Sequence, residues 1–511
     1  MRRLLERLSL PWEVFFAALA TMGAVPLWIV RHPPIQDLTQ HLAAIRVLTD
    51  YSDAQLGFER FFELSLGSTQ YLAYYLAARV LAVPFGVITA NTMLVSASII
   101  GTPYAMRALL RALGRDERLA LFVLPLIWNA HLILGFLNFV AAIPLCLWGL
   151  AVAVQLRQRF SRGRAVGLAV IAVVTFYTHV VPFGFLGLGA ALVAVGDGVR
   201  PTLRRWLPLV PSALAAILWS RTSPAGQSTL TAAFLADGGA GPQPQFMGVL
   251  EALRELPAWL TDVLHSETDE KLLVAWGLLL LASIAFGVGP RDRDGRDARL
   301  GRRLGLLAPL AGLAYFVAPA SYDWIWPINT RFPLLALLFL VPVLPAPRRA
   351  TGVLIFGAVA LVAVLGFVEI AQTFREFEAD EVGALDEAIE VIPPGSRVAG
   401  LIWDRGSRLV KFSPFIHSVA WYQAERGGAV MFTFADFPHS PFRFREGDRP
   451  PRVVPRWEWM PEHVDPRRDL AWYDYVLVRG GPGRIAAERD VYEPLFRDEH
   501  WSVWRRIGSD R

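Results

Sequence analysis

Long apolar stretches recur through the first three quarters of this 511-residue chain and limit the folds that it can adopt. A helix needs about 20 predominantly apolar residues to cross the hydrocarbon core of a bilayer. Stretches of that length, or somewhat shorter, lie at 11–30, 86–106, 119–134, 137–156, 165–180, 183–196, 206–220, 271–289, 305–320, 332–346 and 351–371. Hydrophobic residues make up 54% of the chain, more than water-soluble proteins usually contain. The pattern predicts an α-helical polytopic membrane protein with about eleven transmembrane helices.

The basic residues predict how these helices are oriented. The segment 71–83 contains Arg79 and is too short to cross the membrane unaided, so we expect it to lie along the interface as an amphipathic helix. The cytoplasmic segments then carry 22 Arg and Lys residues, and the longer outer loops carry 8. Because basic residues concentrate in cytoplasmic loops, we expect the N-terminus inside and the C-terminus outside a bacterial inner (plasma) membrane.

Two long outer loops and a C-terminal segment complete the expected organisation. The loops, at 31–85 and 221–270, are much longer than ordinary connectors, and loops of this kind are often functional. After the last apolar stretch the composition changes, near Gln372. We therefore expect a transmembrane domain over 1–371 and a soluble extracytoplasmic α/β domain over 372–511. Its predicted helices lie at 380–391 and 414–426, and its predicted strands at 398–403, 429–434 and 474–478.

Composition and motifs exclude several classes of function. The net charge of +5 is small for this length, so nucleic acid is not an expected partner. The glycine fingerprints that bind ATP or NAD are missing. The single cysteine, Cys146, can form no internal disulfide.

The segment Pro33–His41 (PPIQDLTQH) contains the strongest local signal, just beyond the first apolar stretch. It places the carboxylate of Asp37 and the imidazole of His41 one helical turn apart, on the same face. Both are candidate catalytic residues. The structural alternative is a capping box, with Asp37 as the N-cap of a helix over 38–48 and Gln40 at its third position.

In this layout the chain resembles the GT-C type glycosyltransferases, which include protein O-mannosyltransferases and the aminoarabinose transferases of lipid A. The resemblance rests on the cytoplasmic N-terminus, the Asp37 carboxylate after the first span, an outer loop with interfacial helices and an outer C-terminal domain. Such enzymes take a sugar from a polyprenyl-phosphate carrier. An acidic residue in their first outer loop acts as a base on the acceptor or binds a metal, and Asp37 matches that position. The chain lacks the adjacent acidic pair of the family, because Gln36 and Leu38 flank Asp37.

A phosphate-linked donor also requires a cationic partner for its phosphate. Arg331, which follows Asp323 and a Trp-rich segment, and Arg221 are the candidates at the outer ends of apolar stretches. Arginine pairs bidentately with phosphate oxygens. The alternative is interfacial anchoring, because Trp and Arg also collect at membrane boundaries.

Three further polar positions are weaker candidates. His131 and His179 lie in short outer turns, and Asp323 near Arg331 is a third candidate for an outer-face substrate site. A packing role is the alternative for each histidine. Together with Asp37 and His41, the two histidines could bind a divalent metal, although their spacing does not form a metal motif.

In the C-terminal segment, His417, Asp436 and His439 form no hydrolase signature, so we interpret them as structural.

The sequence favours a glycosyltransferase that moves a sugar from a polyprenyl-phosphate donor to an envelope acceptor at the outer membrane face. Its partners would then be membrane lipid and the lipid-linked donor. A transporter or flippase for a lipid-linked or anionic substrate is the first alternative, but such proteins tend to have charges near the middle of the bilayer. A non-catalytic envelope scaffold is the second.

Overall fold

The computed structural model describes residues 2–227, 243–288, 295–323, 325–347, 349–450, 457–481, 483 and 485–508. The chain divides into two units. The first, here called the helical unit, comprises Met1–Trp28, Val95–Leu132 and Leu137–Ala371. The second, called the mixed unit, comprises Ile29–Leu94, Ile133–Phe136 and Gln372–Arg511. The mixed unit thus combines the whole predicted outer loop 31–85 with the C-terminal segment.

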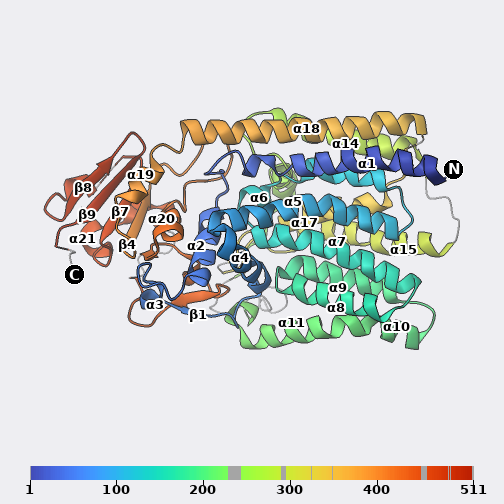
Figure 1. Cartoon of the computed structure of the whole chain (residues 1–511), viewed down its shortest axis with the longest axis horizontal. Helices are drawn as coiled ribbons and strands as arrows, with labels where there is room; N and C mark the ends of the chain where they lie inside the picture. The colour runs from blue at the N-terminus through green and yellow to red at the C-terminus, as the bar shows by residue number, and fades with distance from the viewer. Residues whose placement is uncertain are drawn as a thin grey trace. The chain divides into compact units, whose positions relative to one another are not determined.

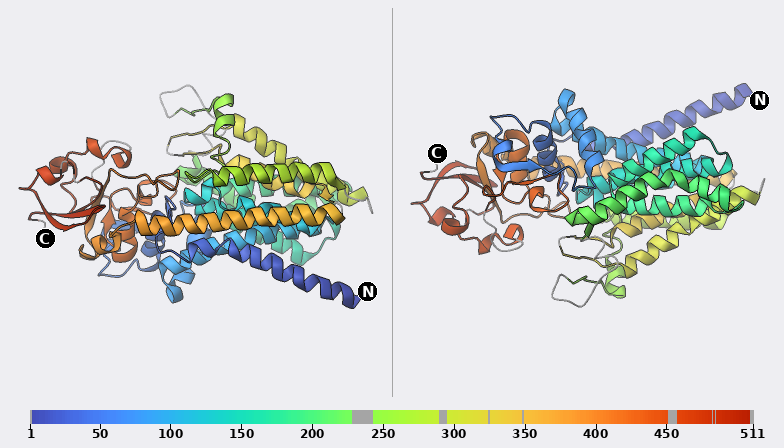
Figure 2. Two further views of the ribbon diagram at one scale, coloured as in Figure 1. Left: turned by 90° about the horizontal axis from the view of Figure 1, so that it is seen from above. Right: turned by 90° about the horizontal axis from the view of Figure 1, so that it is seen from below.

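The helical unit consists of helices that run lengthwise beside one another (Figures 1 and 2). Its longer helices are α1 (Arg2–Met22), α7 (Leu137–Gln158), α8 (Arg162–Phe176), α9 (Val180–Ala194), α11 (Val210–Thr222), α14 (Thr268–Phe286), α16 (Leu307–Val317) and α17 (Arg331–Leu340). Two helices, α5 (Val87–Ala112) and α18 (Arg349–Asp380), extend from one unit into the other. Shorter helices are α10 (Val199–Trp206), α13 (Val249–Glu255) and α15 (Gly295–Gly305).

Glycines allow α7 and α9 to approach closely. A Cβ atom at Gly189 would lie 2.5 Å from Leu150 Cδ2, and one at Gly149 would lie 2.6 Å from Leu186 Cδ1. Real side chains do not tolerate such distances, so each glycine receives a leucine from the opposite helix. Small residues serve the same purpose at helix interfaces in membranes, where close backbone approach replaces the hydrophobic effect.

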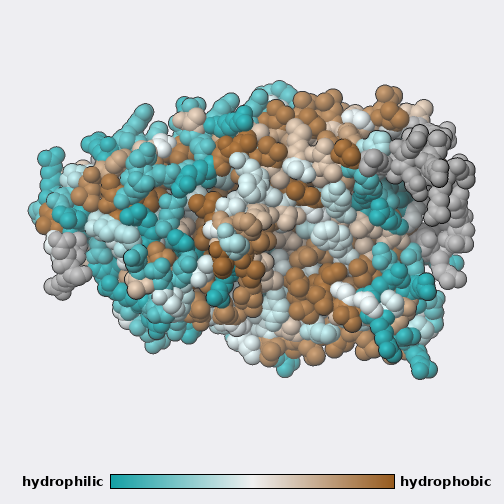
Figure 3. Space-filling model, viewed as in Figure 1, coloured by the Kyte–Doolittle hydropathy of each residue, from teal (hydrophilic) through white to brown (hydrophobic). Residues whose placement is uncertain are grey.

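Four helices in the described part of the chain are long and apolar enough to cross a membrane: Val87–Ala112, Leu137–Gln158, Arg299–Val317 and Ala350–Asp380. Shorter apolar helices lie at Pro11–Leu27, Leu72–Phe85, Val180–Ala194 and Arg331–Val343. Large apolar side chains remain exposed along α8 and α11, for example Val170 and Leu218. Figure 3 shows hydrophobic side chains over these helices, as expected for surfaces that face lipid.

The predicted span 119–134 is wrong as a continuous helix. The structure has a 3₁₀ helix, η2 (Glu117–Leu126), followed by the one-turn helix α6 (Ala130–Ile133). Pro125 has no backbone N–H to continue an α-helix. The Asn129 side chain then accepts the backbone N–H of His131 and begins the new turn.

A five-stranded sheet lies at the centre of the C-terminal segment, within the mixed unit. Its strand order is β5 (Ala429–Val430), β4 (Arg397–Ile402), β7 (Tyr475–Arg479), β9 (Trp501–Arg506) and β8 (Tyr492–Arg497). Strands β5, β4 and β7 are parallel, and β9 is antiparallel to both of its neighbours. The helices α19 (Leu385–Glu390) and α20 (Val419–Arg426) belong to this segment. The predicted strand over 429–434 is thus only two residues long, and β8 and β9 were not predicted.

The segment 29–94 packs against these C-terminal elements. Its helices are α2 (Leu38–Thr49), which packs on α20, α4 (Leu72–Phe85), which packs on α2, and the short α3 (Phe58–Phe61). Strand β1 (Phe62–Leu64) pairs with β6 (Phe442–Phe444). Arg31 forms ion pairs with Asp386 at 2.9 Å and Glu425 at 2.6 Å. These contacts fix the start of α2 against the C-terminal residues.

Candidate functional site

Asp37 is the N-cap residue of α2, but its side chain makes no capping hydrogen bond. The predicted capping box is therefore wrong. Its other member, Gln40, uses its side chain elsewhere: the amide nitrogen donates to the Phe432 carbonyl, and Oε1 accepts the N–H of Phe434 at 3.1 Å. The Gln40 side chain therefore binds Phe432 and Phe434, far away in the sequence, instead of the N-cap backbone. The carboxylate of Asp37 is consequently left for another role.

The backbone of Asp37 is held by the loop 133–135. The N–H of Asp37 donates to the Leu134 carbonyl at 3.1 Å, and that of Gln36 donates to the Ile133 carbonyl at 2.9 Å. Gly135 has a φ of +84°, and a Cβ atom there would lie 2.7 Å from the Asp37 nitrogen. Only glycine fits this position, both for its dihedral angle and for its contact. The loop therefore positions Asp37 without using its carboxylate.

The side chain of His417 lies next to the Asp37 carboxylate. Its Nε2 atom lies 3.3 Å from Asp37 Oδ1, and the two side chains are 18% and 16% exposed. This distance is within the range of an ion pair, but the geometry is not that of a hydrogen bond. Among the described residues, Asp37 Oδ1 has no hydrogen-bond partner. The carbonyl of His417 accepts the Thr39 hydroxyl at 2.8 Å, which ties the histidine to α2. We interpreted His417 as structural from the sequence, whereas the structure places it against Asp37.

Asp37 and His417 lie at the carboxyl ends of the parallel strands β4 and β5. His417 belongs to the loop that follows β4, and Phe432 and Phe434 belong to the loop that follows β5. Both loops contact the first turn of α2, through Thr39 and Gln40. In open α/β sheets, ligands bind in the crevice outside the carboxyl ends of the strands. Asp37 and His417 therefore occupy a position that suits a binding or catalytic site.

His41 uses both of its ring nitrogens in internal hydrogen bonds. Nε2 donates to the Gly135 carbonyl at 2.9 Å, and Nδ1 accepts the Tyr75 hydroxyl at 3.0 Å. Burial lowers the pKa of His41 to about 4, against the smaller opposing effects of the Asp37 charge and the bond to Gly135. The ring is therefore neutral at pH 7, with its tautomer fixed. This geometry supports a positioning role, through the loop that holds Asp37, rather than the catalytic role that we expected.

The other candidate histidines lie in the helical unit. His131 Nε2 donates to the Thr330 carbonyl at 2.9 Å, and the His179 Nδ1 atom accepts the N–H of Val181, which caps α9. The ring of Phe139 lies between them, 5.0 Å from that of His131 and 5.3 Å from that of His179. Both histidines thus have the packing contacts that we gave as the alternative.

The candidate cations differ in burial. Arg331 is the first residue of α17, is 9% exposed and donates to the Pro327 carbonyl. Arg221 is exposed at the end of α11, and Asp323 is exposed in a turn with a φ of +51°. Trp324, between Asp323 and Arg331, lies outside the described residues, as does 228–242 of the predicted outer loop.

Within the described ranges, no group of three or more His, Cys, Asp or Glu side chains could hold a metal ion. Asp37 and His41 therefore belong to no such group within the described part of the mixed unit, and His131 and His179 belong to none within that of the helical unit.

No family model and no curated protein matches this chain. Two solved structures of ArnT from Cupriavidus metallidurans are similar to it. The apo structure matches with 13% identity and a TM-score of 0.47, over 98% of this chain and 99% of that one. The structure bound to undecaprenyl phosphate matches with 14% identity and a TM-score of 0.49, over 98% of each chain. ArnT is an aminoarabinose transferase of the GT-C type, the class that the sequence resembles. It assigns no residue a role.

Proposed function

We propose that this protein is a membrane glycosyltransferase that moves a sugar from a polyprenyl-phosphate donor to an envelope acceptor. The observation that carries the proposal is the Asp37 carboxylate. It is held in place through its backbone, it makes no capping bond, and it faces His417 across 3.3 Å at the carboxyl edge of the sheet. The Asp37 side chain is partly exposed and makes no capping bond, so its carboxylate is suited to accept a proton from a substrate hydroxyl.

The reaction needs one proton transfer and one displacement. Asp37 takes the proton of the acceptor hydroxyl while the acceptor oxygen attacks the anomeric carbon of the donor sugar. A new C–O bond forms, and the bond between that carbon and the phosphate oxygen breaks. Polyprenyl phosphate leaves with the electron pair of the broken bond and one additional negative charge. A general base at this position typically contributes about 100- to 10,000-fold to the rate.

The chain offers a membrane setting for a lipid-linked donor. Four described helices are long and apolar enough to span a bilayer. We place the protein in a bacterial inner membrane, with the N-terminus in the cytoplasm and Asp37 on the outer side, as the basic residues predict. Undecaprenyl phosphate, the ligand in one of the similar structures, belongs to the proposed class of carrier.

Arg331 is the proposed ligand of the donor phosphate. It begins α17, and the N–H groups and dipole at a helix N-terminus favour an anion. Arg331→Lys should weaken the binding of a polyprenyl-phosphate analogue about tenfold or more, because lysine keeps the charge but loses the planar fork. Equilibrium binding of a labelled analogue to the purified protein measures this, with the exposed Arg254→Lys as the matched control. Unchanged binding in both Arg331→Lys and Arg331→Ala would make the residue an interfacial anchor.

The function itself is tested with the purified protein in liposomes that contain a polyprenyl-phosphate sugar labelled in the sugar. We expect the label to pass to an acceptor in an envelope lipid extract, with release of equimolar polyprenyl phosphate. Movement of intact donor across the bilayer without release would instead show a flippase. Neither release nor movement, with several donor sugars and a protein that melts cooperatively, would contradict both.

A further inference from the structure

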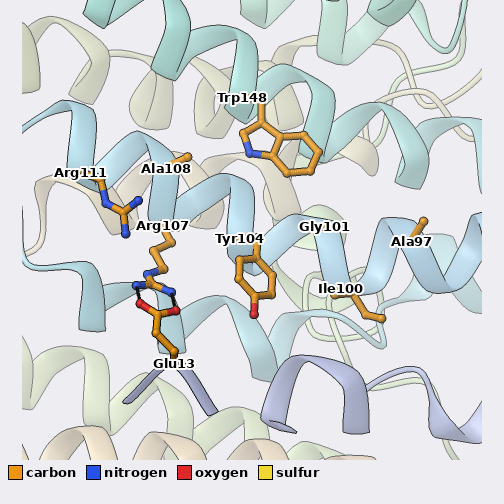
Figure 4. A pocket seen from close by; sticks show the side chains of 9 residues that line it. All are labelled: Glu13, Ala97, Ile100, Gly101, Tyr104, Arg107, Ala108, Arg111 and Trp148. Atoms are coloured by element: carbon orange, nitrogen blue, oxygen red, sulfur yellow. Dashed lines mark hydrogen bonds and ion pairs between the residues drawn. The ribbon is translucent and has the colours of Figure 1, made fainter. Parts of the chain in front are cut away.

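A groove of about 620 Å³ lies in the helical unit over α5, away from the residues considered above (Figure 4). Glu13 of α1 lies on one side of it, and Trp148 of α7 lies on the other. Residues of α5 line the rest: Ala97, Ile100, Gly101, Tyr104, Arg107, Ala108 and Arg111. The groove thus follows α5 between two other apolar helices.

The groove has a small-residue floor and aromatic walls. Ala97, Gly101 and Ala108 have small side chains or none, and a Cβ atom at Gly101 would lie 3.5 Å from both Trp148 Cη2 and Pro144 Cβ of α7. The Tyr104 ring, on the other side, packs edge-on against Phe16 at 5.1 Å. This lining suits an apolar chain.

One end of the groove carries charges of both signs. Arg107 donates to both carboxylate oxygens of Glu13, as Figure 4 shows, and its Nε donates to Glu117 at 2.6 Å. Arg111 forms a second bidentate contact with Glu117, at 2.8 and 2.7 Å. The Arg107 side chain is only 7% exposed, whereas that of Glu13 is 47% and that of Arg111 is 62% exposed. The two charged groups that a ligand can reach are therefore the Glu13 carboxylate, which is negative, and the Arg111 guanidinium, which is positive.

The length of the groove matches one leaflet of a bilayer. Ala97 and Arg107 are ten residues apart on one helix, which corresponds to about 15 Å at 1.5 Å per residue. The hydrocarbon core of a bilayer is about 30 Å thick, so a single leaflet supplies about half of that. Since α5 is a candidate membrane span, the charged end lies where lipid head groups would be.

We propose that this groove binds one phospholipid with a zwitterionic phosphoethanolamine head group. An acyl chain lies between Tyr104 and Trp148, the phosphate meets Arg111, and the ammonium group meets Glu13. An anionic head group without an amine would satisfy Arg111 but would leave Glu13 next to negative charge. The charge pattern therefore selects a head group that carries both signs.

The test compares retention of phosphatidylethanolamine and phosphatidylglycerol by the full-length protein, purified in detergent and measured by native mass spectrometry. Phosphatidylethanolamine should be preferred about tenfold, the value of one charge-assisted hydrogen bond. Gly101→Leu should fill the groove and abolish retention of both lipids. Gly277→Leu is the matched control, because Gly277 on α14 has open space around its Cβ position; it should retain lipid like the parent.

Two charge variants test the head group. Glu13→Gln should remove the preference between the two lipids, and Arg111→Gln, which leaves the Arg107–Glu13 pair intact, should weaken both about tenfold. Equal retention in Gly101→Leu and Gly277→Leu would overturn the site. Equal affinity of the parent for the two lipids would overturn the head-group assignment. Thermal melts show whether each variant is folded.

Discussion

Asp37→Asn should lower sugar transfer by about 100- to 10,000-fold and leave the melting temperature unchanged. Asparagine has nearly the same shape as aspartate, but its amide cannot accept the proton of the acceptor hydroxyl. The contacts that hold residue 37 come from its backbone, to Leu134 and the loop around Gly135, so they survive the substitution. Asparagine also caps helices about as well as aspartate, which removes any remaining effect on α2.

The matched control is Asp50→Asn, at the opposite end of α2. Asp50 forms a partly exposed ion pair with Arg46 within the same helix end, and pairs of this i, i+4 kind contribute little to stability. Its variant should keep the transfer activity of the parent. Transfer activity is measured in liposomes with labelled donor, and folding by thermal melting. A normally folded Asp37→Asn protein with full activity would exclude Asp37 as the base.

His417→Asn should reduce transfer about 10- to 100-fold, whereas His417→Gln should retain most of it. The imidazole Nε2 atom faces Asp37 Oδ1 at 3.3 Å, and a charge-assisted hydrogen bond formed there on substrate binding would orient the carboxylate. The longer glutamine side chain can place its amide nitrogen near the position of Nε2. Asparagine places its amide near Nδ1, too far from Asp37.

Glutamine also fills more of the volume of histidine than asparagine does, so a double variant is needed to separate the positioning role from packing. In an Asp37→Asn background, neither change at 417 should reduce activity further, since coupled residues are not additive. His463→Asn, at an exposed position, is the control. Equal activities of the His417→Asn and His417→Gln proteins would contradict the orientation of Asp37 by Nε2.

The sequence predicted those features that depend on neighbouring residues. The helix over 38–48 was expected and is observed as α2, and the strand at 398–403 is observed as β4. The break within 119–134 had local signals in Pro125 and Asn129, which the long apolar run outweighed. Strands β8 (YEPLFR) and β9 (WSVWRR) lie on either side of a short turn near Asp498. Neither strand alternates strictly between polar and apolar residues, so the sequence signal for a strand is weak.

The candidate site depended on contacts between distant residues. Asp37 could be singled out from its position after the first apolar stretch, but no local pattern connects it with His417. Their proximity results from the packing of α2 on α20 and from the parallel order of β5, β4 and β7. The capping box failed for the same reason, because Gln40 binds the loop after β5. Whether Gln40 binds the N-cap backbone or the segment after β5 is decided by the tertiary structure.

The mixed unit is built from three stretches of chain that are synthesised at different times. Three separate stretches of chain contribute Asp37, the loop 133–135 that holds its backbone, and His417. Asp37 and His417 are 380 positions apart. At about 5 to 20 residues per second, a ribosome needs roughly 20 to 80 s to synthesise that interval. Asp37, the N-cap residue of α2, is therefore synthesised well before its partner exists. A nascent chain cannot assemble the Asp37–His417 pair until residue 417 has been synthesised.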